Sequence, residues 1–503
     1  MAHTPDVSTR SAERQATGIT GLDDIVNGGL PKNRLYLVKG LPGVGKTTLA
    51  LQFLMAGARA GERTLYITLS ETEEEIRQVA DSHGFSLDGI ELFELSSAEQ
   101  NLQLQDENTL YATADVDLKE VTRVLLDQVE RVKPDRVVFD SLSEIRLLAG
   151  TPIRYRRQLL ALKQHFAGLA STVLLLDDRS YEAGDLQVES LVHGVVALEH
   201  HASEYGADRR RLRIVKLRGS RFRSGYHDFI VRTGGLEVFP RLVAAEHRTD
   251  VVAAPISSGN SSLDAILGGG IDRATCTLLI GPAGAGKSII ATQFAAASAK
   301  RGEPACIFLF EERIGTWRTR AMNLGVPVDE LMQNGLLRIQ QVDPAELAPD
   351  EFTHLVRAAV ENGGARLVAI DSVTGYYTAM PEARSLTLQI HELLAYLSER
   401  DVASMLTMAQ SGMIGANMTS AVDISYLADT VLLLRYFESE GHVKKAVSVL
   451  KKRSGPHEEA IREVRFGSHG VEIGPPLSMM HGVLTGLPRT IAHGGDGPLS
   501  GQP

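Results

Sequence analysis

The chain carries one long pattern twice, and this internal repeat constrains its fold more than any other feature of the sequence. A glycine-rich loop ends in Gly-Lys-Thr at Lys46 and returns as Gly-Lys-Ser at Lys287, 241 positions later. The acidic residues Glu71 and Glu312, which follow apolar runs, keep the same separation. A unit of this length is large enough to form its own core. We therefore expect two consecutive domains that share one fold.

Each copy alternates apolar strands with amphipathic helices, which predicts the α/β class with a mostly parallel sheet and helices on both faces. In the first copy, we expect helices over residues 48–59, 73–82 and 118–132 and strands over residues 64–69 and 136–140. Late segments of each copy have the character of hairpin and edge strands, so we expect antiparallel hairpins after the parallel core. These are residues 211–216, 226–231 and 236–240, and residues 444–451 and 463–466 in the second copy.

The joint between the copies is expected in a polar, alanine-rich stretch. The expected organisation is a flexible N-terminus (residues 1–15), an N-terminal domain (16–245), a linker (246–256), a C-terminal domain (257–490) and a flexible tail (491–503).

The composition argues against several classes of protein. Hydrophobic residues make up 43% of the 503 residues, which is too much for a disordered chain. The net charge of -10 makes nucleic acid an unexpected partner, because the whole molecule repels polyanions. The two cysteines, Cys276 and Cys306, lie in apolar runs and are expected to be buried thiols in a reducing compartment. No signal peptide or long apolar run is found, so we expect a cytoplasmic protein that does not enter a membrane.

Both copies contain the pattern Gly-x-x-x-x-Gly-Lys-Thr/Ser between a strand and a helix, which is the context that a phosphate-binding loop requires. Glycines let backbone N–H groups converge on phosphate oxygens, and the lysine reaches the terminal phosphates. The loops therefore predict two sites for ATP with Mg²⁺. The candidate nucleotide-binding residues are Gly40, Gly43, Gly45, Lys46, Thr47 and Thr48, and Gly281, Gly284, Gly286, Lys287, Ser288 and Ile289.

A magnesium ion at each loop needs oxygen ligands from the protein. The hydroxyls of Thr47 and Ser288 are the first candidates, since the residue after the loop lysine ligates the metal in such sites. Asp140 and Asp371 each end a buried apolar strand, which brings a carboxylate to the same edge of the sheet. We expect these four residues to hold the metal, although an aspartate after an apolar run can also be a simple turn residue.

Hydrolysis also requires a group that orients the attacking water, and a carboxylate at the end of a neighbouring strand is suited to that task. The second copy offers Glu311 and Glu312, whereas the first offers Ser70 and Glu71. If the base is the first carboxylate of the pair, as in Glu311, the N-terminal site hydrolyses ATP only weakly, because it has Ser70 there. If the second carboxylate suffices, both sites hydrolyse ATP.

Charge on a transferring phosphoryl group calls for cations, which a neighbouring subunit often donates. The candidates are Lys216 and Arg218 in the first copy and Lys451 and Arg453 in the second, each pair in a late hairpin. The competing interpretation is a solvated basic edge strand that discourages pairing with other sheets.

These residues together resemble the KaiC family, the double-domain ATPases related to RecA and RadA that form the core of the cyanobacterial circadian clock. The resemblance spans residues ~15 to ~490 at the level of motif order. It is carried by both phosphate loops, by the Glu-Glu pair, by the two Asp-Ser strand ends, by Lys-Leu-Arg at 216–218 and by residues 457–463. It implies two tandem RecA-like P-loop NTPase domains.

The resemblance further implies a homohexamer whose assembly depends on ATP, with nucleotide at the subunit interfaces and the lysine and arginine of each K-x-R element acting across them. It implies slow ATPase activity in the N-terminal ring and serine/threonine autokinase and autophosphatase activity in the C-terminal ring. The protein would then be a regulator in circadian or stress signalling, read through its phosphorylation state. KaiB-like proteins, or response regulators and histidine kinases, would be its partners.

The candidate phosphorylation sites depart from the family pattern. The family has an adjacent Ser-Thr pair, whereas this chain has Ser425 and Tyr426. Phosphorylation at Ser425 is expected, an ordered two-site cycle is in doubt, and both residues could instead be polar interface residues. The segment 477–489 is shorter and less aromatic than the family's tail, so binding of the usual activator is not expected.

Two other functions stay open. One is a RecA/RadA-like DNA-dependent ATPase, which the acidic charge and the lack of a basic stripe interleaved with aromatic residues disfavour. The single tryptophan, Trp317, is expected to be a core or interface anchor in a helix. The other is an ATP-gated assembly scaffold without kinase activity, in which the N-terminal half binds nucleotide without turnover.

Overall fold

The computed structural model describes residues 13–95, 114–178, 185–202, 206–247, 255–378, 383–410, 423–468, 470–484 and 489–490. The expected flexible tail, residues 491–503, and residues 1–12 of the expected N-terminal segment lie outside these ranges. The chain divides into two compact units between Arg241 and Leu242, and each is described by itself.

The first unit is built on a nine-stranded sheet in which the strand of the phosphate loop is central. Its strand order is β11-β10-β9-β8-β3-β7-β6-β4-β5. The strands from β8 to β5 in this order pair in parallel, whereas β9, β10 and β11 pair antiparallel with their neighbours. The strands are β3 (Leu35–Gly40), β4 (Thr64–Thr68), β5 (Ile90–Glu94), β6 (Arg136–Asp140), β7 (Thr172–Asp178), β8 (Gly194–His201), β9 (Arg209–Leu217), β10 (His227–Arg232) and β11 (Gly235–Phe239).

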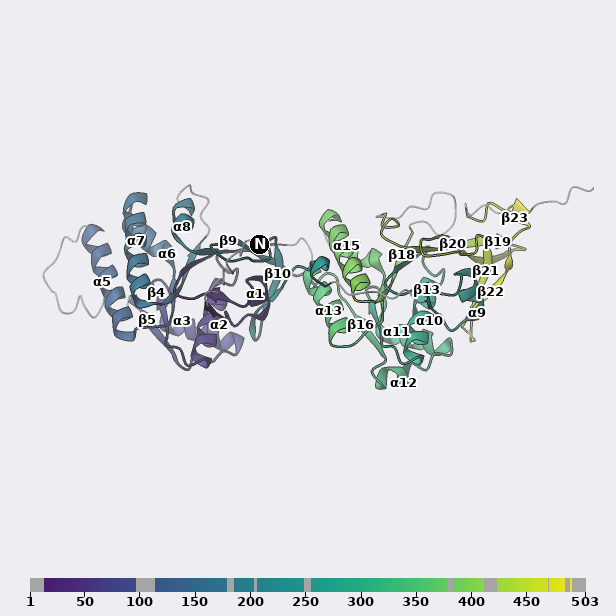
Figure 1. The fold of residues 1–503 in the computed structure, drawn as a ribbon, viewed down its shortest axis with the longest axis horizontal. Helices are drawn as coiled ribbons and strands as arrows, with labels where there is room; N and C mark the ends of the chain where they lie inside the picture. The colour runs from purple at the N-terminus through teal and green to yellow at the C-terminus, as the bar shows by residue number, and fades with distance from the viewer. Residues whose placement is uncertain are drawn as a thin grey trace, which may run out of the picture. The chain divides into compact units, whose positions relative to one another are not determined.

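Two layers of helices cover this sheet (Figure 1). Alternate residues of β3 explain why, since Tyr36 and Val38 pack in one apolar cluster and Leu35 and Leu37 pack in the other. The first cluster contains α1 (Thr20–Ile25), α2 (Lys46–Arg59) and α3 (Glu73–His83). The second contains α5 (Ala114–Val132), α6 (Leu142–Ala149), α7 (Pro152–Leu169) and α8 (Asp185–Leu191). A short pair, β1 (Arg14–Gln15) with β2 (Leu30–Pro31), lies outside the main sheet.

The second unit repeats this architecture with the order β16-β15-β17-β18-β14-β19-β20-β21-β22. Pairing is parallel from β16 to β19 and antiparallel from β19 to β22. Its strands are β14 (Cys276–Gly281), β15 (Ala305–Leu309), β16 (Leu337–Gln341), β17 (Leu367–Asp371), β18 (Ala403–Ala409), β19 (Thr430–Ser439), β20 (His442–Lys452), β21 (Arg462–Gly467) and β22 (Gly470–Pro476). Outside this sheet, β12 (Pro255–Ile256) pairs with β13 (Ile271–Asp272) and β23 (Met480–His481) with β24 (Arg489–Thr490).

The helices of the second unit also form two layers. One apolar cluster contains α9 (Ser261–Ile266), α10 (Lys287–Lys300), α11 (Ile314–Asn323) and α12 (Val328–Gln333). The other contains α13 (Pro349–Glu361), α14 (Val373–Thr378) and α15 (Ala383–Glu399). The expected fold class is thereby confirmed: two mostly parallel sheets, each with helices on both faces and late antiparallel hairpins.

Element boundaries differ from the sequence-based expectation by a few residues. Helix α2 begins at Lys46 rather than at Thr48, because Gly45 takes the left-handed conformation (φ 111°) that ends the loop and starts the helix. Helix α5 begins at Ala114, four residues before the expected start at Leu118. Both cysteines are buried free thiols, as expected. Among the helices in the described ranges, none is long and apolar enough to cross a membrane.

The boundary between the two units falls after residue 241, four residues before the expected end of the N-terminal domain at residue 245. Leu242 and Ala244 are buried in an apolar cluster of the second unit, which explains the earlier division. The short 3-10 helix η1 (Ala244–His247) and β12 fall within or beside the expected linker. At the other end, Arg14 and Gln15 form β1, inside the segment expected to be a flexible N-terminus.

Trp317 is a core anchor of the second unit. Its side chain is fully buried on α11, and its indole N–H donates a hydrogen bond to Thr292 Oγ1 on α10 over 3.0 Å. We expect Trp317→Ala to lower the free energy of unfolding of this unit by about 3–5 kcal/mol, because a large cavity and an unpaired hydroxyl result. Urea unfolding followed by circular dichroism measures the change. Met322→Ala on the same helix, where the side chain is 45% exposed, is the control and should change it far less.

Candidate nucleotide-binding sites

Both phosphate loops lie at the carboxyl end of a central strand and lead directly into a helix. In the first unit β3 ends at Gly40 and α2 begins at Lys46; in the second β14 ends at Gly281 and α10 begins at Lys287. The loop N–H groups and the helix N-terminus therefore meet at one point, which suits an anion. This is the context that the sequence pattern predicts for a phosphate site.

One glycine of the second loop allows an unusually close approach. Gly286 has φ 111°, and a Cβ atom at this position would lie 2.1 Å from the ring of Phe466 on β21. Any side chain here would displace either the ring or the loop. The hairpin and the phosphate loop are thus packed directly against each other.

The loop lysines are buried and make matching contacts. Lys46 Nζ donates to the carbonyls of Gly40 and Leu41 over 2.9 and 3.1 Å, and Lys287 Nζ donates to those of Gly281 and Pro282 over 2.8 Å each. Burial lowers the pKa of Lys287, while the nearby carboxylates of Asp371 and Glu311 oppose that shift. Both ammonium groups therefore lie within their own phosphate loops.

The first loop carries an acidic neighbour of its lysine that the second loop lacks. Asp178, at the end of β7, forms an ion pair with Lys46 over 2.8 Å. Strand register places Asp178 beside Gly40, and it places Ala409 beside Gly281 in the second unit. The two sites therefore differ in charge at the phosphate edge.

In the first unit, the two candidate metal ligands lie together. Thr47 Oγ1 donates to Asp140 Oδ2 over 3.1 Å, and Tyr66 OH donates to the same oxygen over 2.5 Å. Burial raises the pKa of Asp140. A hydroxyl and a carboxylate are the oxygen ligands that Mg²⁺ prefers when it also binds phosphates, so these residues fit the metal.

In the second unit, Ser288 and Asp371 occupy the corresponding positions, but the contacts differ. Asp371 Oδ1 accepts a hydrogen bond from Thr407 Oγ1 on β18 over 2.5 Å. No direct hydrogen bond joins Ser288 to Asp371, both of which are described. Oxygen ligands of the same kind are present, so this site also fits the metal.

The two candidate bases of the second unit have different partners. Glu311 follows β15 and its Oε1 accepts a hydrogen bond from Ser372 Oγ over 3.0 Å, at the end of the neighbouring β17. Glu312 is instead paired with Arg320 of α11, over 2.6 Å. Glu311 thus lies near enough to the loop lysine to interact with it electrostatically, as Asp371 does, whereas an arginine neutralises Glu312.

Glu71 has the surroundings of Glu311 rather than those of its sequence counterpart Glu312. Its pKa is raised by burial and by the neighbouring carboxylates of Asp140, Glu75 and Asp178, while Lys46 opposes the shift. Its Oε2 atom is buried without a hydrogen-bond partner among the described residues. Glu71 therefore has the electrostatic surroundings of Glu311, although it lies one residue further along the sequence than the counterpart of Glu311, Ser70.

The K-x-R cations contact a segment of their own unit. Lys451 Nζ donates to the carbonyls of Ser425 and Ala428 over 3.2 and 2.6 Å. Arg453 donates to the carbonyl of Tyr426 over 3.0 Å and contacts Asp429 over 3.4 Å. The structure thus brings the second K-x-R pair together with both candidate phosphorylation sites, a juxtaposition that the sequence does not reveal.

The first unit has the same arrangement with different side chains. Lys216 donates to the carbonyl of Glu189, and Arg218 donates to that of Ser190 over 2.8 Å. Glu189 corresponds to Ser425, because Lys216 and Lys451 donate to the backbone carbonyls of these two residues in the same way. Glu189 forms an ion pair with Lys39 of the loop strand β3. The first unit therefore has a paired carboxylate where the second has a hydroxyl.

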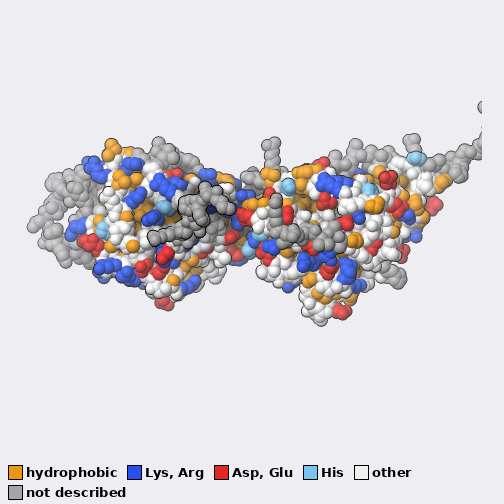
Figure 2. Space-filling model, viewed as in Figure 1, with side chains coloured by type: hydrophobic (Ala, Val, Ile, Leu, Met, Phe, Trp, Pro, Cys, Tyr) orange, Lys and Arg blue, Asp and Glu red, His pale blue; other side chains and the backbone are white. Residues whose placement is uncertain are grey.

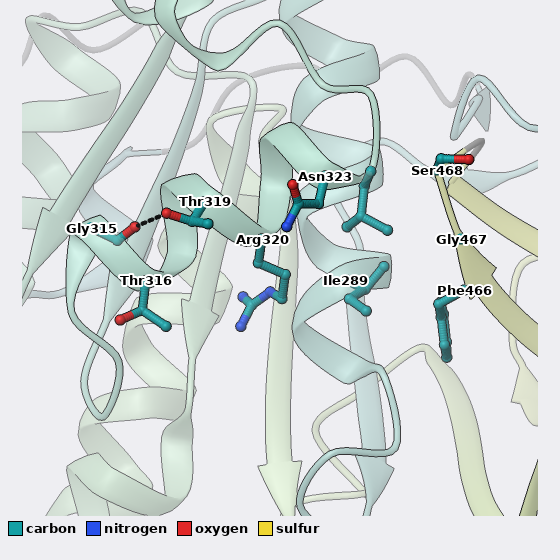
Figure 3. A pocket seen from close by; sticks show the side chains of 10 residues that line it. Ile289, Gly315, Thr316, Thr319, Arg320, Asn323, Phe466, Gly467 and Ser468 are labelled. Atoms are coloured by element: carbon teal, nitrogen blue, oxygen red, sulfur yellow. Dashed lines mark hydrogen bonds between the residues drawn. The ribbon is translucent and has the colours of Figure 1, made fainter.

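An open pocket of about 750 Å³ lies beside the first turn of α10, which follows the second phosphate loop, and it is large enough for a nucleoside. In Figure 3, side chains of α11 and Phe466 of β21 lie on its two sides, with Ile289 of α10 between them. Ile289, a predicted binding residue, therefore lines it. The counterpart of Ile289 in the first unit is Thr48, which is hydrogen-bonded to His83 over 3.3 Å. The corresponding place in the first unit is therefore more polar.

Lys445 is a site residue that the sequence analysis missed. Its ammonium lies 5.1 Å from the ring centre of Phe466 and 5.9 Å from that of Tyr436, whose hydroxyl donates to Ala283 in the loop. Burial lowers the pKa of Lys445, and no carboxylate in the described ranges pairs with it. No local motif marks this residue, because its position depends on the pairing of β19 with β20.

The fold and the two loops define a protein of the tandem RecA-like P-loop NTPase class. A family model described as "ATPase: KaiC" matches residues 15–243 and again residues 256–478. The chain therefore belongs to the KaiC family of ATPases, which confirms the resemblance found in the sequence. Membership in this ATPase family supports ATP as the nucleotide that the protein binds and hydrolyses.

Curated relatives match almost the whole chain. The "Circadian clock oscillator protein KaiC" of Thermostichus vulcanus is 27% identical over 474 residues, covering 93% of this chain and 90% of the relative. The "Circadian clock oscillator protein KaiC 1" of a Synechocystis species is 27% identical over 477 residues, with the same coverage. The protein named KaiC in Prochlorococcus marinus is 27% identical over 484 residues, covering 94% of each chain.

Proposed function

We propose that this KaiC-family ATPase also phosphorylates itself on Ser425, removes that phosphate again, and serves as a phosphorylation-state regulator in circadian or stress signalling. The observation that carries the proposal is the contact of Lys451 and Arg453 with the segment of Ser425 and Tyr426. Cations of this kind stabilise a transferring phosphoryl group.

The proposed assembly is a homohexamer that forms with ATP at the interfaces between subunits. In each unit the K-x-R cations are bound to the segment near Ser425 or Glu189, and a phosphate loop of a second copy would bring the nucleotide to them. Loop lysines, Lys445 and the cavity at Ile289 would bind the phosphates and the nucleoside.

Each residue set has a proposed task in the reaction. Thr47 with Asp140, and Ser288 with Asp371, would hold Mg²⁺, which neutralises charge on the phosphates when bound. Glu71 and Glu311 would orient the attacking water in their respective sites. The partners proposed for the assembled protein are KaiB-like proteins, response regulators or histidine kinases.

Incubation with ATP labelled on its γ-phosphate, followed by peptide mapping, tests the proposal. Label on Ser425 that disappears in Ser425→Ala and persists in Tyr426→Phe supports it. Label on Tyr426 alone would identify Tyr426, rather than Ser425, as the phosphorylated residue. Steady phosphate release from an unlabelled chain would leave only the ATPase.

A second candidate concerns the first unit, which could be an ATP-gated scaffold without turnover. The specific observation in its favour is Ser70, which stands where the second unit has Glu311. Opposing it is the buried carboxylate of Glu71 beside Lys46 and Asp140.

The pH dependence of the first site separates these alternatives. In a Lys287→Ala background, we expect residual ATP hydrolysis to fall on acidification with a midpoint above pH 4.5, because the raised pKa of Glu71 protonates the base earlier than an ordinary glutamate. The initial rate of phosphate release between pH 4 and 8 gives this profile. Adding Glu71→Gln should abolish the hydrolysis, and nucleotide binding without any turnover in the Lys287→Ala protein would favour the scaffold.

A DNA-dependent ATPase remains the third candidate. One local feature favours it: Arg211 and Arg213 of β9 lie over the ring of Tyr226, at 4.1 and 5.2 Å, and the sequence analysis did not identify this basic and aromatic group. Glu199 pairs with Arg211 and accepts from Tyr226, so the group is partly neutralised. On the face shown in Figure 2, basic and acidic side chains are interspersed. Stimulation of hydrolysis by single-stranded DNA would select this candidate.

A further inference from the structure

The hydroxyl of Ser425 is hydrogen-bonded to a carboxylate two residues earlier in the chain. Ser425 Oγ donates to Asp423 Oδ1 over 2.7 Å, and the backbone N–H of Ser425 donates to the same oxygen over 2.9 Å. The two bonds hold the carboxylate within hydrogen-bond distance of the serine hydroxyl, where it can accept the hydroxyl proton. Asp423 has no task in the reaction proposed above.

The surrounding segment holds this pair in place. Ile424 and Ala428 are buried in the apolar cluster of α13, α14 and α15. Lys451 binds the carbonyls of Ser425 and Ala428, and the N–H of Leu427 donates to the carbonyl of Ile424. The half-buried Ser425 is therefore presented from an anchored turn, while Asp423 is exposed to solvent.

The carboxylate is in the protonation state that a base needs. Hydrogen bonds from the side chain and backbone of Ser425 lower the pKa of Asp423, so it is ionised at neutral pH. In protein kinases, an aspartate accepts the proton of the substrate hydroxyl during phosphoryl transfer, and the ionised carboxylate is the form that can accept it.

Glu311 has surroundings that suit a different task. Its carboxylate is bound to Ser372 beside the loop of Lys287 in the same unit. There it can orient a water molecule toward the nucleotide of its own loop. The chain thus offers separate carboxylates for the two acceptors of the phosphoryl group, water and serine.

We propose that Asp423 is the general base for phosphorylation of Ser425. This inference rests on the proposed function, in which Ser425 is the acceptor. Ser425 Oγ forms a bond to the γ-phosphorus of ATP, the bond from that phosphorus to the β,γ-bridging oxygen breaks, and its electron pair leaves with ADP. The hydroxyl proton passes to Asp423 Oδ1.

The replacement Asp423→Asn tests the base directly, because an amide oxygen can accept both hydrogen bonds but cannot take up the proton at neutral pH. The initial rate of label incorporation at Ser425 from γ-labelled ATP is measured for the unaltered protein, Asp423→Asn and Asp423→Ala. Glu440→Gln, a carboxylate-to-amide change at an exposed turn of the same unit, is the matched control. Circular dichroism and the melting temperature establish that each variant is folded.

We expect the rate at Ser425 to fall by roughly 10²-fold or more in both Asp423→Asn and Asp423→Ala and to stay unchanged in Glu440→Gln. A normal rate in Asp423→Asn with a low rate in Asp423→Ala would overturn the proposal, since Asp423 would then only position the hydroxyl. Normal rates in both variants would overturn it as well. Absence of label in the unaltered protein would refute the autokinase and the base together, whereas the preceding outcomes leave the autokinase intact.

Discussion

The Lys287→Ala variant is expected to lose phosphoryl transfer by the second unit while still assembling in the presence of ATP. Lys287 is the buried ammonium of the second loop, close to Asp371 and Glu311, and its removal takes away the main cation at the terminal phosphates. We expect labelling of Ser425 to fall by about 10²–10³-fold, the scale for the loss of one transition-state donor. Label incorporation and size-exclusion chromatography with and without ATP measure the two properties.

The matching variant in the first unit, Lys46→Ala, is expected to impair assembly more than phosphoryl transfer. The family resemblance implies slow turnover in the first unit, so its ATP would stay bound and hold subunits together. Lys46→Ala should therefore weaken ATP-dependent assembly. Elution profiles that do not respond to nucleotide, or identical behaviour of the two variants, would contradict this division of tasks.

The second large effect is expected at Glu311. In a Glu71→Gln background, which silences the first site, Glu311→Gln should lower ATP hydrolysis by roughly 10²–10³-fold, because the amide cannot accept a proton from the attacking water. Glu312→Gln should have a much smaller effect, since Arg320 already neutralises Glu312. Steady-state phosphate release measures both.

The same pair of variants also tests whether the two acceptors use different bases. Label at Ser425 should be reduced less than hydrolysis in Glu311→Gln if Asp423 serves the serine. If Glu311→Gln lowers label incorporation and hydrolysis equally, Glu311 is the base for both the serine and the water. If hydrolysis is unchanged in Glu311→Gln, Glu312 is the residue that orients the water.

Local patterns in the sequence were sufficient to predict the fold class and the two phosphate loops. A glycine loop between a strand and a helix is defined by consecutive residues, and the apolar runs before Asp140 and Asp371 predict strand ends from periodicity alone. These features depend on short-range geometry. For the same reason, their positions were found within a few residues.

Contacts between distant segments could not be predicted in the same way. Glu71 aligns with Glu312 by residue number but has the electrostatic surroundings of Glu311, because the turn after β4 places its side chain beside Lys46 and Asp140. Lys445 reaches the loop only through the pairing of β19 with β20. The division between units at Arg241 follows from the burial of Leu242, which a composition shift does not reveal.

Glu189, which is paired with Lys39, places a negatively charged carboxylate in the first unit where the second unit has a neutral hydroxyl. A phosphate on Ser425 would make the second half resemble the first in the sign of this charge, without a lysine to balance it, since Ile280 aligns with Lys39. Phosphorylation would then change the charge of the second unit at this place, while the first unit would keep the same charge throughout.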